Sequence, residues 1–115
     1  MFVLVAHFRT DSTPAASGAV PDPAAEPLAM LAASPECRRM SFAHSTEAPN
    51  RFVLVAEFES AAAYRRALSP FPMRTVVVPW LSTADQQHSE VSEVLLSSVD
   101  GIVSRWRPTV PQPGR

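Results

Sequence analysis

The sequence predicts a single α+β domain with a four-stranded antiparallel sheet, covered by helices on one face and by a second copy of the chain on the other. Three observations support this class. The chain has 115 residues, enough for one domain with one core. Strand-like and helix-like segments follow one another in the order β-α-β-β-α-β. The two clearest strands are apolar on both faces, and helices can cover only one of these faces.

Two segments of nearly the same sequence, residues 2–9 and 51–59, are the clearest strands. The first begins Phe-Val-Leu-Val-Ala-His-Phe, and the second contains Phe-Val-Leu-Val-Ala-Glu-Phe; both are rich in aromatic and β-branched residues. Their similarity suggests a duplicated β-α-β unit. Strand alternation assigns one set of positions to the face beneath the helices: Phe2, Leu4, Ala6, Phe8, Phe52, Leu54, Ala56 and Phe58.

The first helix is predicted over residues 24–34, after a loop that is rich in proline. We place Pro27 in its first turn, where a backbone N–H has no helical partner. Leu28 and Leu31 have the spacing of a buried helical stripe. A strand over residues 37–46 follows and turns back into the second apolar strand.

A second helix and a short helical turn are predicted next. Ser60 is a good N-cap for an alanine-rich helix. Residues 75–78 have strand propensity, but Pro79 excludes a long central strand. We therefore predict a helical turn here, with Trp80 and Leu81 facing inward.

The last predicted strand spans residues 90–98 and ends before Gly101. We assign residues 1–100 to the domain and residues 101–115 to a loosely ordered, proline-rich tail. The complete order, β-α-β-β-α-β with one small extra element, is typical of the ferredoxin-like split β-α-β arrangement.

The second face of the two apolar strands carries valine where a water-facing sheet should carry polar residues. Such a patch must be covered, and no helix is left to cover it. We therefore predict a homodimer with sheet packed against sheet about a two-fold axis. The predicted interface residues are Val3, Val5, His7, Val53, Val55 and Glu57.

Composition argues against several kinds of partner and site. A net charge of −1 gives no basic surplus for nucleic acid, and no segment approaches the roughly 20 apolar residues of a membrane span. Cys37 is the single cysteine, and the three histidines lack ligand spacing, so neither a disulfide nor a metal site is expected. Without a signal-peptide pattern, the expected location is the cytoplasm.

Residues 51–68 resemble the strand-to-helix segment of the antibiotic biosynthesis monooxygenase (ABM) family. They read Arg-Phe-Val-Leu-Val-Ala-Glu-Phe-Glu-Ser-Ala-Ala-Ala-Tyr-Arg-Arg-Ala-Leu. Residues 73–81, Met-Arg-Thr-Val-Val-Val-Pro-Trp-Leu, are similar to the segment that follows in actinobacterial members. The resemblance extends over about residues 2–96 and is specific over residues 52–81. It implies a dimeric α+β barrel with a pocket between sheet and helices in each subunit.

The same resemblance implies an activity and a set of site residues. Members include cofactor-free oxygenases that convert aromatic polyketides to quinones, because a carbanion of the substrate itself reacts with oxygen. A homodimer that binds a small aromatic substrate without metal or flavin is therefore expected. The resemblance implies catalytic roles for His44 and Tyr64. The expected substrate-binding residues are Phe8, Leu54, Phe58, Met73, Arg74 and Trp80.

Two alternatives to an oxygenase remain open. Leu54 and Phe58 stand where members carry a pocket Asn and Trp, and neither can hydrogen-bond a substrate; a non-catalytic ligand-binding or interaction dimer would explain them. A polyketide isomerase or cyclase could use the same acid–base pocket without oxygen. If His44 and Tyr64 do not share one cavity, the oxygenase hypothesis loses the only residues that are specific to it.

Overall fold

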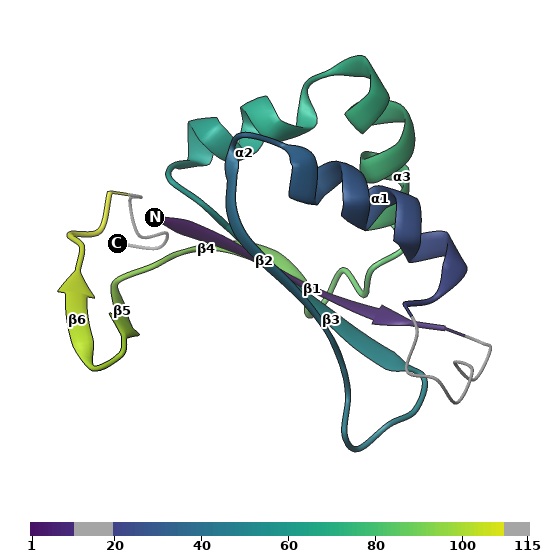
Figure 1. The fold of residues 1–115 in the computed structure, drawn as a ribbon, viewed down its shortest axis with the longest axis horizontal. Coiled ribbons are helices and arrows are strands. Elements are labelled where there is room, and N and C mark those ends of the chain that lie inside the picture. The colour runs from purple at the N-terminus through teal and green to yellow at the C-terminus, as the bar shows by residue number, and fades with distance from the viewer. Residues whose placement is uncertain (11–19, 110–115) are drawn as a thin grey trace.

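The computed structural model describes residues 1–10 and 20–109 (Figure 1), and its elements follow the predicted order. In chain order they are β1 (Phe2–Arg9), α1 (Asp22–Ala33), β2 (Cys37–His44), β3 (Arg51–Phe58), α2 (Ala61–Leu68), the π-helical segment η1 (Met73–Val77), α3 (Val78–Leu81), β4 (Glu90–Glu93), β5 (Leu96–Val99) and β6 (Ile102–Arg105). No helix of this described part is long and apolar enough to span a membrane.

The main sheet has four strands in the order β2-β3-β1-β4, and all neighbours are antiparallel. The α+β class and the four-stranded antiparallel sheet are therefore confirmed. All three α-helices lie on one side of this sheet (Figure 1). The sheet remains open in the described chain, so a closed barrel would require strands from a second copy.

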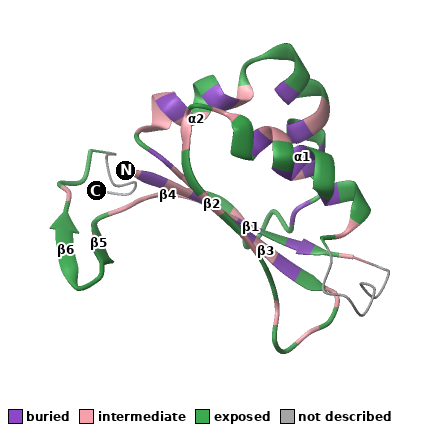
Figure 2. Ribbon diagram, viewed as in Figure 1, coloured by how far each residue is buried: buried purple, intermediate pink, exposed green. Residues whose placement is uncertain are grey.

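The core lies between the sheet and the helices, where alternation predicts it. All eight positions assigned to the helix-facing side are buried (Figure 2). On the opposite side Val3, Val5, Val53 and Val55 are only half-buried, and His7 is exposed. We call this second surface, which is centred on the four valines, the valine face.

Of the two longer helices, α2 begins where its predicted cap places it, and α1 does not begin where predicted. Ser60 Oγ accepts a hydrogen bond from Ala63 N at 3.0 Å, so the predicted N-cap of α2 is confirmed. Helix α1 starts at Asp22, earlier than predicted, and Pro27 lies inside the helix and not in its first turn. The ring of Pro27 is buried. Its apolar contacts offset the helical hydrogen bond that proline cannot donate.

The helical turn predicted around Pro79 is present. Segment η1 continues directly into helix α3, and Pro79 is the second residue of α3. Trp80 is buried, as predicted, and Leu81 is half-buried.

The prediction of one strand over residues 90–98 is wrong. Strand β4 ends at Glu93, which pairs with Phe2 at the start of β1, so β1 offers no further partner. The chain instead forms a separate β5–β6 hairpin through Asp100 and Gly101, whose positive φ angles of 50° and 81° suit a tight turn. Strand β6 falls within residues 101–115, where a loose tail is expected; the division into domain and tail stays a prediction.

A candidate cavity between sheet and helices

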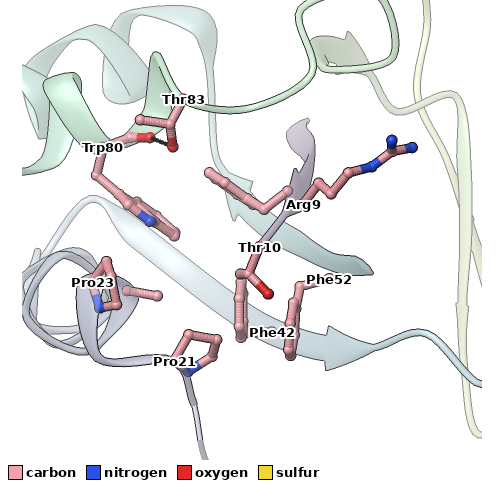
Figure 3. A pocket seen from close by; sticks show the side chains of 10 residues that line it. Arg9, Thr10, Pro21, Pro23, Phe42, Phe52, Trp80 and Thr83 are labelled. Carbon is pink, nitrogen blue, oxygen red and sulfur yellow. Dashed lines mark hydrogen bonds between the residues drawn. The ribbon is translucent and has the colours of Figure 1, made fainter. Parts of the chain in front are cut away.

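A cavity of about 440 Å³ opens between the sheet and the helices where β1 ends. This volume lies in the range of pockets that bind small organic molecules. Its walls come from the end of β1, the start of α1, the two strands β2 and β3, and the region of α3 (Figure 3). The lining residues are Phe8, Arg9, Thr10, Pro21, Pro23, Ala24, Phe42, Phe52, Trp80 and Thr83.

Four aromatic rings form a connected wall of this cavity. Phe8 and Trp80 are stacked, with ring centroids 4.4 Å apart and planes 9° from parallel. Phe42 and Phe52 are also stacked, at 5.4 Å and 5°. Phe42 joins the two stacks through a tilted contact with Phe8 at 6.2 Å. Flat ring faces of this kind bind flat, apolar ligands by stacking.

The positions of these rings follow from strand alternation and register. Phe8 and Phe52 are cross-strand partners on the helix-facing side, and Phe42 lies on the same side of the neighbouring strand. Trp80 reaches the rings from α3 above the sheet (Figure 3). Pro21 and Pro23 open α1 without contributing backbone N–H groups, so this side of the mouth is also apolar.

The few polar groups of the cavity are neutral or directed elsewhere. The Thr83 hydroxyl donates to Trp80 O at 2.6 Å and keeps the ability to accept. The Arg9 guanidinium extends away from the cavity in Figure 3. None of the ten described lining residues is His, Tyr, Asp, Glu or Cys. The cavity therefore offers shape and stacking, and any base must reach it from a neighbouring position.

His44 occupies such a neighbouring position, because its imidazole lies against Phe52, one of the rings of the cavity wall. Its imidazole stacks on Phe52, with centroids 4.6 Å apart and planes 15° from parallel. Its Nε2 lies 2.9 Å from Pro49 O, and a carbonyl oxygen can only accept, so Nε2 carries the proton and Nδ1 is the basic nitrogen of the neutral ring. His44 lines a second hollow of about 430 Å³, which shares Phe52 with the cavity.

Tyr64 lies elsewhere, so the structure does not bring the two predicted catalytic residues together. It lines a third hollow of about 270 Å³ beside β4 and packs edge-on against Phe58 at 5.2 Å. Burial raises the pKa of its phenol above the ordinary value, which keeps the hydroxyl protonated.

The structure separates the predicted substrate-binding residues into two groups. Phe8 and Trp80 line the cavity. Leu54 and Phe58 are completely buried in the core, and Met73 is buried at the start of η1. Arg74 is exposed, with its guanidinium 6.0 Å from the Phe71 ring.

Phe42 and Phe52 are the main cavity residues that the sequence analysis did not assign to a site. Phe52 was assigned to the core face and Phe42 to no role. The signal available was the even spacing of Phe42 and His44 within the predicted strand, which places both on one face beside Phe52.

The valine face carries its charges at opposite ends. His7 pairs with Val53, whereas Glu57 pairs with Val3, so the two residues lie at opposite ends of one copy. The carboxylate of Glu57 lies 3.9 Å from Arg39 Nε. A His7–Glu57 contact within one copy is therefore excluded by the register.

Neither a metal nor a disulfide site was found in residues 1–10 and 20–109. These ranges contain no group of three His, Cys, Asp or Glu residues that could hold a metal ion. Cys37 is a half-buried free thiol, and burial raises its pKa above the ordinary value, so its reactive thiolate form is disfavoured.

Known proteins with this fold include oxygenases. SnoaB, a cofactor-independent oxygenase from Streptomyces nogalater, is 21% identical, with 96% of this chain and 97% of that chain covered at a TM-score of 0.58. A conserved protein from Methanosarcina mazei Go1 is 10% identical, with 92% of each chain covered at a TM-score of 0.59. At these identities the likeness shows the fold alone.

Family assignment comes from the sequence. A crystal structure described as an antibiotic biosynthesis monooxygenase shares 19% identity, covering 94% of this chain and 100% of that one at a TM-score of 0.57. A search of curated proteins gave no significant match. The family model described as "Antibiotic biosynthesis monooxygenase" matches residues 1–70, well over half of the chain. This protein therefore belongs to the antibiotic biosynthesis monooxygenase family.

Proposed function

We propose that this protein is a cofactor-independent monooxygenase of specialised metabolism that oxidises a polycyclic phenol of the aromatic polyketide type. The observation that carries the proposal is the cavity of about 440 Å³ walled by four aromatic rings. Its flat, apolar walls suit a fused-ring substrate. The cofactor-independent oxygenase from S. nogalater, which has the same fold, supports the same reading.

The proposed reaction converts an activated CH₂ group of the substrate into a carbonyl. A base removes one proton, and the resulting carbanion is stabilised by the phenol ring system. The carbanion reduces O₂ and forms a carbon-bound hydroperoxide. Loss of water from this hydroperoxide gives the quinone, so one oxygen atom enters the product and the other leaves as water. No external reductant is required.

We assign the role of base to His44. Its Nδ1 is the unprotonated nitrogen of the neutral imidazole, as the contact between Nε2 and Pro49 O indicates. Phe52 separates the imidazole from the cavity and lines both hollows. Rotation of the Phe52 side chain would join the two spaces and let Nδ1 approach a substrate bound against Phe42 and Trp80.

The test is oxygen uptake with an anthrone-type phenol, compared between wild type and His44→Ala. Loss of a general base should lower kcat by about 100-fold or more. The control is Arg65→Ala, since Arg65 is exposed on α2 and lines none of the three hollows described above. Equal rates for wild type and His44→Ala would contradict the assignment of the base.

Tyr64→Phe tests the second predicted catalytic residue. A hydroxyl that donates to the substrate predicts a slower reaction in this variant. The position of Tyr64 in a different hollow predicts a rate close to wild type, with a small change in the melting temperature only.

A ligand-binding protein without turnover is the second candidate. It is favoured by the lack of His, Tyr, Asp, Glu and Cys among the described lining residues. This function predicts saturable binding of the phenol with no oxygen uptake above background. Conversion of the ligand without oxygen would instead indicate an isomerase or cyclase.

The proposed active unit is a homodimer in the cytoplasm. The half-buried valine face, on the side of the sheet away from the helices, supports the dimer. All ten basic residues are arginine, which supports an origin in the actinobacterial branch of the family.

A further inference from the structure

The imidazole of His44 is exposed, and two contacts determine how it is held. Stacking on Phe52 fixes the plane of the ring but not which nitrogen carries the proton. The contact between Nε2 and Pro49 O, at 2.9 Å, is the one hydrogen bond that the described residues make to this ring. Because a carbonyl oxygen only accepts, this contact selects the tautomer with a basic Nδ1. The orientation of one peptide carbonyl in the β2–β3 loop therefore determines which nitrogen of His44 can act as a base.

This carbonyl belongs to a tight turn over residues 48–51. Arg51 N donates to Ala48 O at 3.2 Å, which closes a four-residue β-turn with Pro49 and Asn50 at its centre. Asn50 is not among the residues with a positive φ, so the turn is of type I and not of type II. Proline at the first central position suits both types. The second central position decides between them, because type II requires a positive φ there.

The turn is anchored on both sides, so its carbonyl has a fixed position beside the ring. Ser45 Oγ accepts hydrogen bonds from Glu47 N and from Ala48 N, each at 3.1 Å. On the other side, Thr10 N donates to Asn50 O at 2.9 Å. Thr10 lines the aromatic cavity. The turn that holds His44 is therefore tied to the mouth of this cavity.

We propose that Asn50 is a positioning residue, which keeps the turn in type I and so presents Pro49 O to His44. The inference rests on the proposed function, in which His44 is the base. In a type II turn the central peptide is turned over, so the N–H of residue 50 would face His44 Nε2 in place of the carbonyl. Nε2 would then accept the hydrogen bond, and the proton of the neutral ring would lie on Nδ1. The nitrogen assigned as the base would no longer be basic.

The first experiment changes the turn and leaves His44 in place. Asn50→Gly favours type II, because a Pro-Gly pair at the two central positions suits that turn. Asn50→Ser is the matched control, since it removes the same amide group but keeps a Cβ and therefore a negative φ. A strong NOE between Pro49 Hα and the N–H of residue 50 reports the type II turn. The nitrogen chemical shifts of the neutral His44 ring report its tautomer, with His44→Ala to identify the signals.

The expected result is a reversal of the tautomer in one variant only. Wild type and Asn50→Ser should carry the proton on Nε2, and Asn50→Gly should carry it mainly on Nδ1. A type I turn that persists in Asn50→Gly would overturn the role of Asn50. A type II turn with the proton still on Nε2 would show that the carbonyl does not select the tautomer, and would also overturn the proposal.

The second experiment measures oxygen uptake with the anthrone-type phenol. Asn50→Gly should lower kcat about tenfold, with KM little changed, because a correctly protonated base is lost while the cavity is intact. Asn50→Ser should retain a rate close to that of wild type. Melting temperatures of the two variants show whether either substitution only destabilises the fold, which would slow the reaction without moving the tautomer.

The outcomes separate this inference from the function on which it rests. A wild type without oxygen uptake overturns the proposed function, and the NMR measurement still decides whether Asn50 sets the tautomer of His44. Equal kcat values for Asn50→Gly and Asn50→Ser, in a protein whose wild type takes up oxygen, overturn the positioning role in catalysis alone.

Discussion

Trp80 shows how one side chain can serve both the core and the cavity. It is 9% exposed and stacks on Phe8, as a core aromatic would. Its ring also forms part of the cavity wall (Figure 3). Its indole N–H donates to no other described residue, so it is available to a ligand oxygen. Substitution of Trp80 should therefore change the affinity for the ligand, and ligand binding should change the fluorescence of the Trp80 indole.

Trp80→Phe should weaken the binding of a flat phenol about fivefold, from a loss of about 1 kcal/mol in stacking and hydrogen bonding. The measurement is a fluorescence titration, in which the bound phenol quenches the indole of the wild type. Trp106→Phe removes the other of the two tryptophans and leaves this quenching intact. Quenching that survives in Trp80→Phe and vanishes in Trp106→Phe would move the ligand out of the cavity.

At the scale of elements, strand β4 is too short to pair with the whole of β1. The loop segment before β4, residues 85–89, forms the remaining hydrogen bonds, and we call this segment the strap. Strand β4 pairs only with Phe2 to Val5. Beyond this point the loop before β4 supplies the hydrogen bonds: Asp85 N donates to His7 O at 2.7 Å, and His7 N donates to Ser89 Oγ at 2.9 Å. These contacts hold the segment of β1 that leads to the cavity.

The strap should loosen in acid. The hydrogen bond from His88 Nδ1, at 2.8 Å, is the main cause that lowers the pKa of Asp85, and the Gln87 N–H adds to it. A lowered folded-state pKa means that this stabilisation is complete above the ordinary aspartate pKa and is lost as pH falls through the folded value. Amide signals of His7 and Ser89, followed by NMR from roughly pH 5 to pH 2, should shift together.

Asp85→Asn is the control for this acid transition. It cannot titrate at this position, so the signals of His7 should no longer change in step with an aspartate pKa. An unchanged transition in Asp85→Asn would assign the acid effect to another carboxylate.

Strand alternation predicted the sheet well because β1 and β3 each commit one face to the core. The same reasoning failed for the last strand. Its length is set by where β1 begins and can pair with it, which depends on the tertiary structure and not on the local sequence. The Asp100–Gly101 pair is a sequence typical of a hairpin turn. A hairpin outside the main sheet has no buried face, however, so strand alternation could not predict it. Pro27 shows the same limit: its helical position is tolerated only because the core covers its ring.

For the whole molecule, the proposed dimer is tested at the centre of the valine face. Val55 pairs with Val5 there. Val55→Arg would place an unpaired charge in a desolvated interface, and light scattering after size exclusion should then give the mass of one chain. Phe71→Asp should keep the mass of the wild type. A Val55→Arg dimer would require another interface.

The candidate site could be predicted only in part. Sequence pattern identified the aromatic positions Phe8 and Trp80, but the pattern of a buried ring and that of a cavity-lining ring are the same. Which one results depends on how closely α1 and α3 approach the sheet. His44 and Tyr64 were expected in one pocket from the family resemblance, and they line different hollows.

The repeated strand sequence also bears on how the chain reaches its fold. Strands β1 and β3 carry nearly the same seven residues and pair antiparallel, with Val5 opposite Val55 at the centre. During synthesis β1 emerges first and must wait for about forty further residues before its partner exists. Until then, the β1 of a neighbouring nascent chain offers an almost equivalent partner. Folding therefore competes with pairing between chains, and it proceeds best when chains are made or refolded far apart.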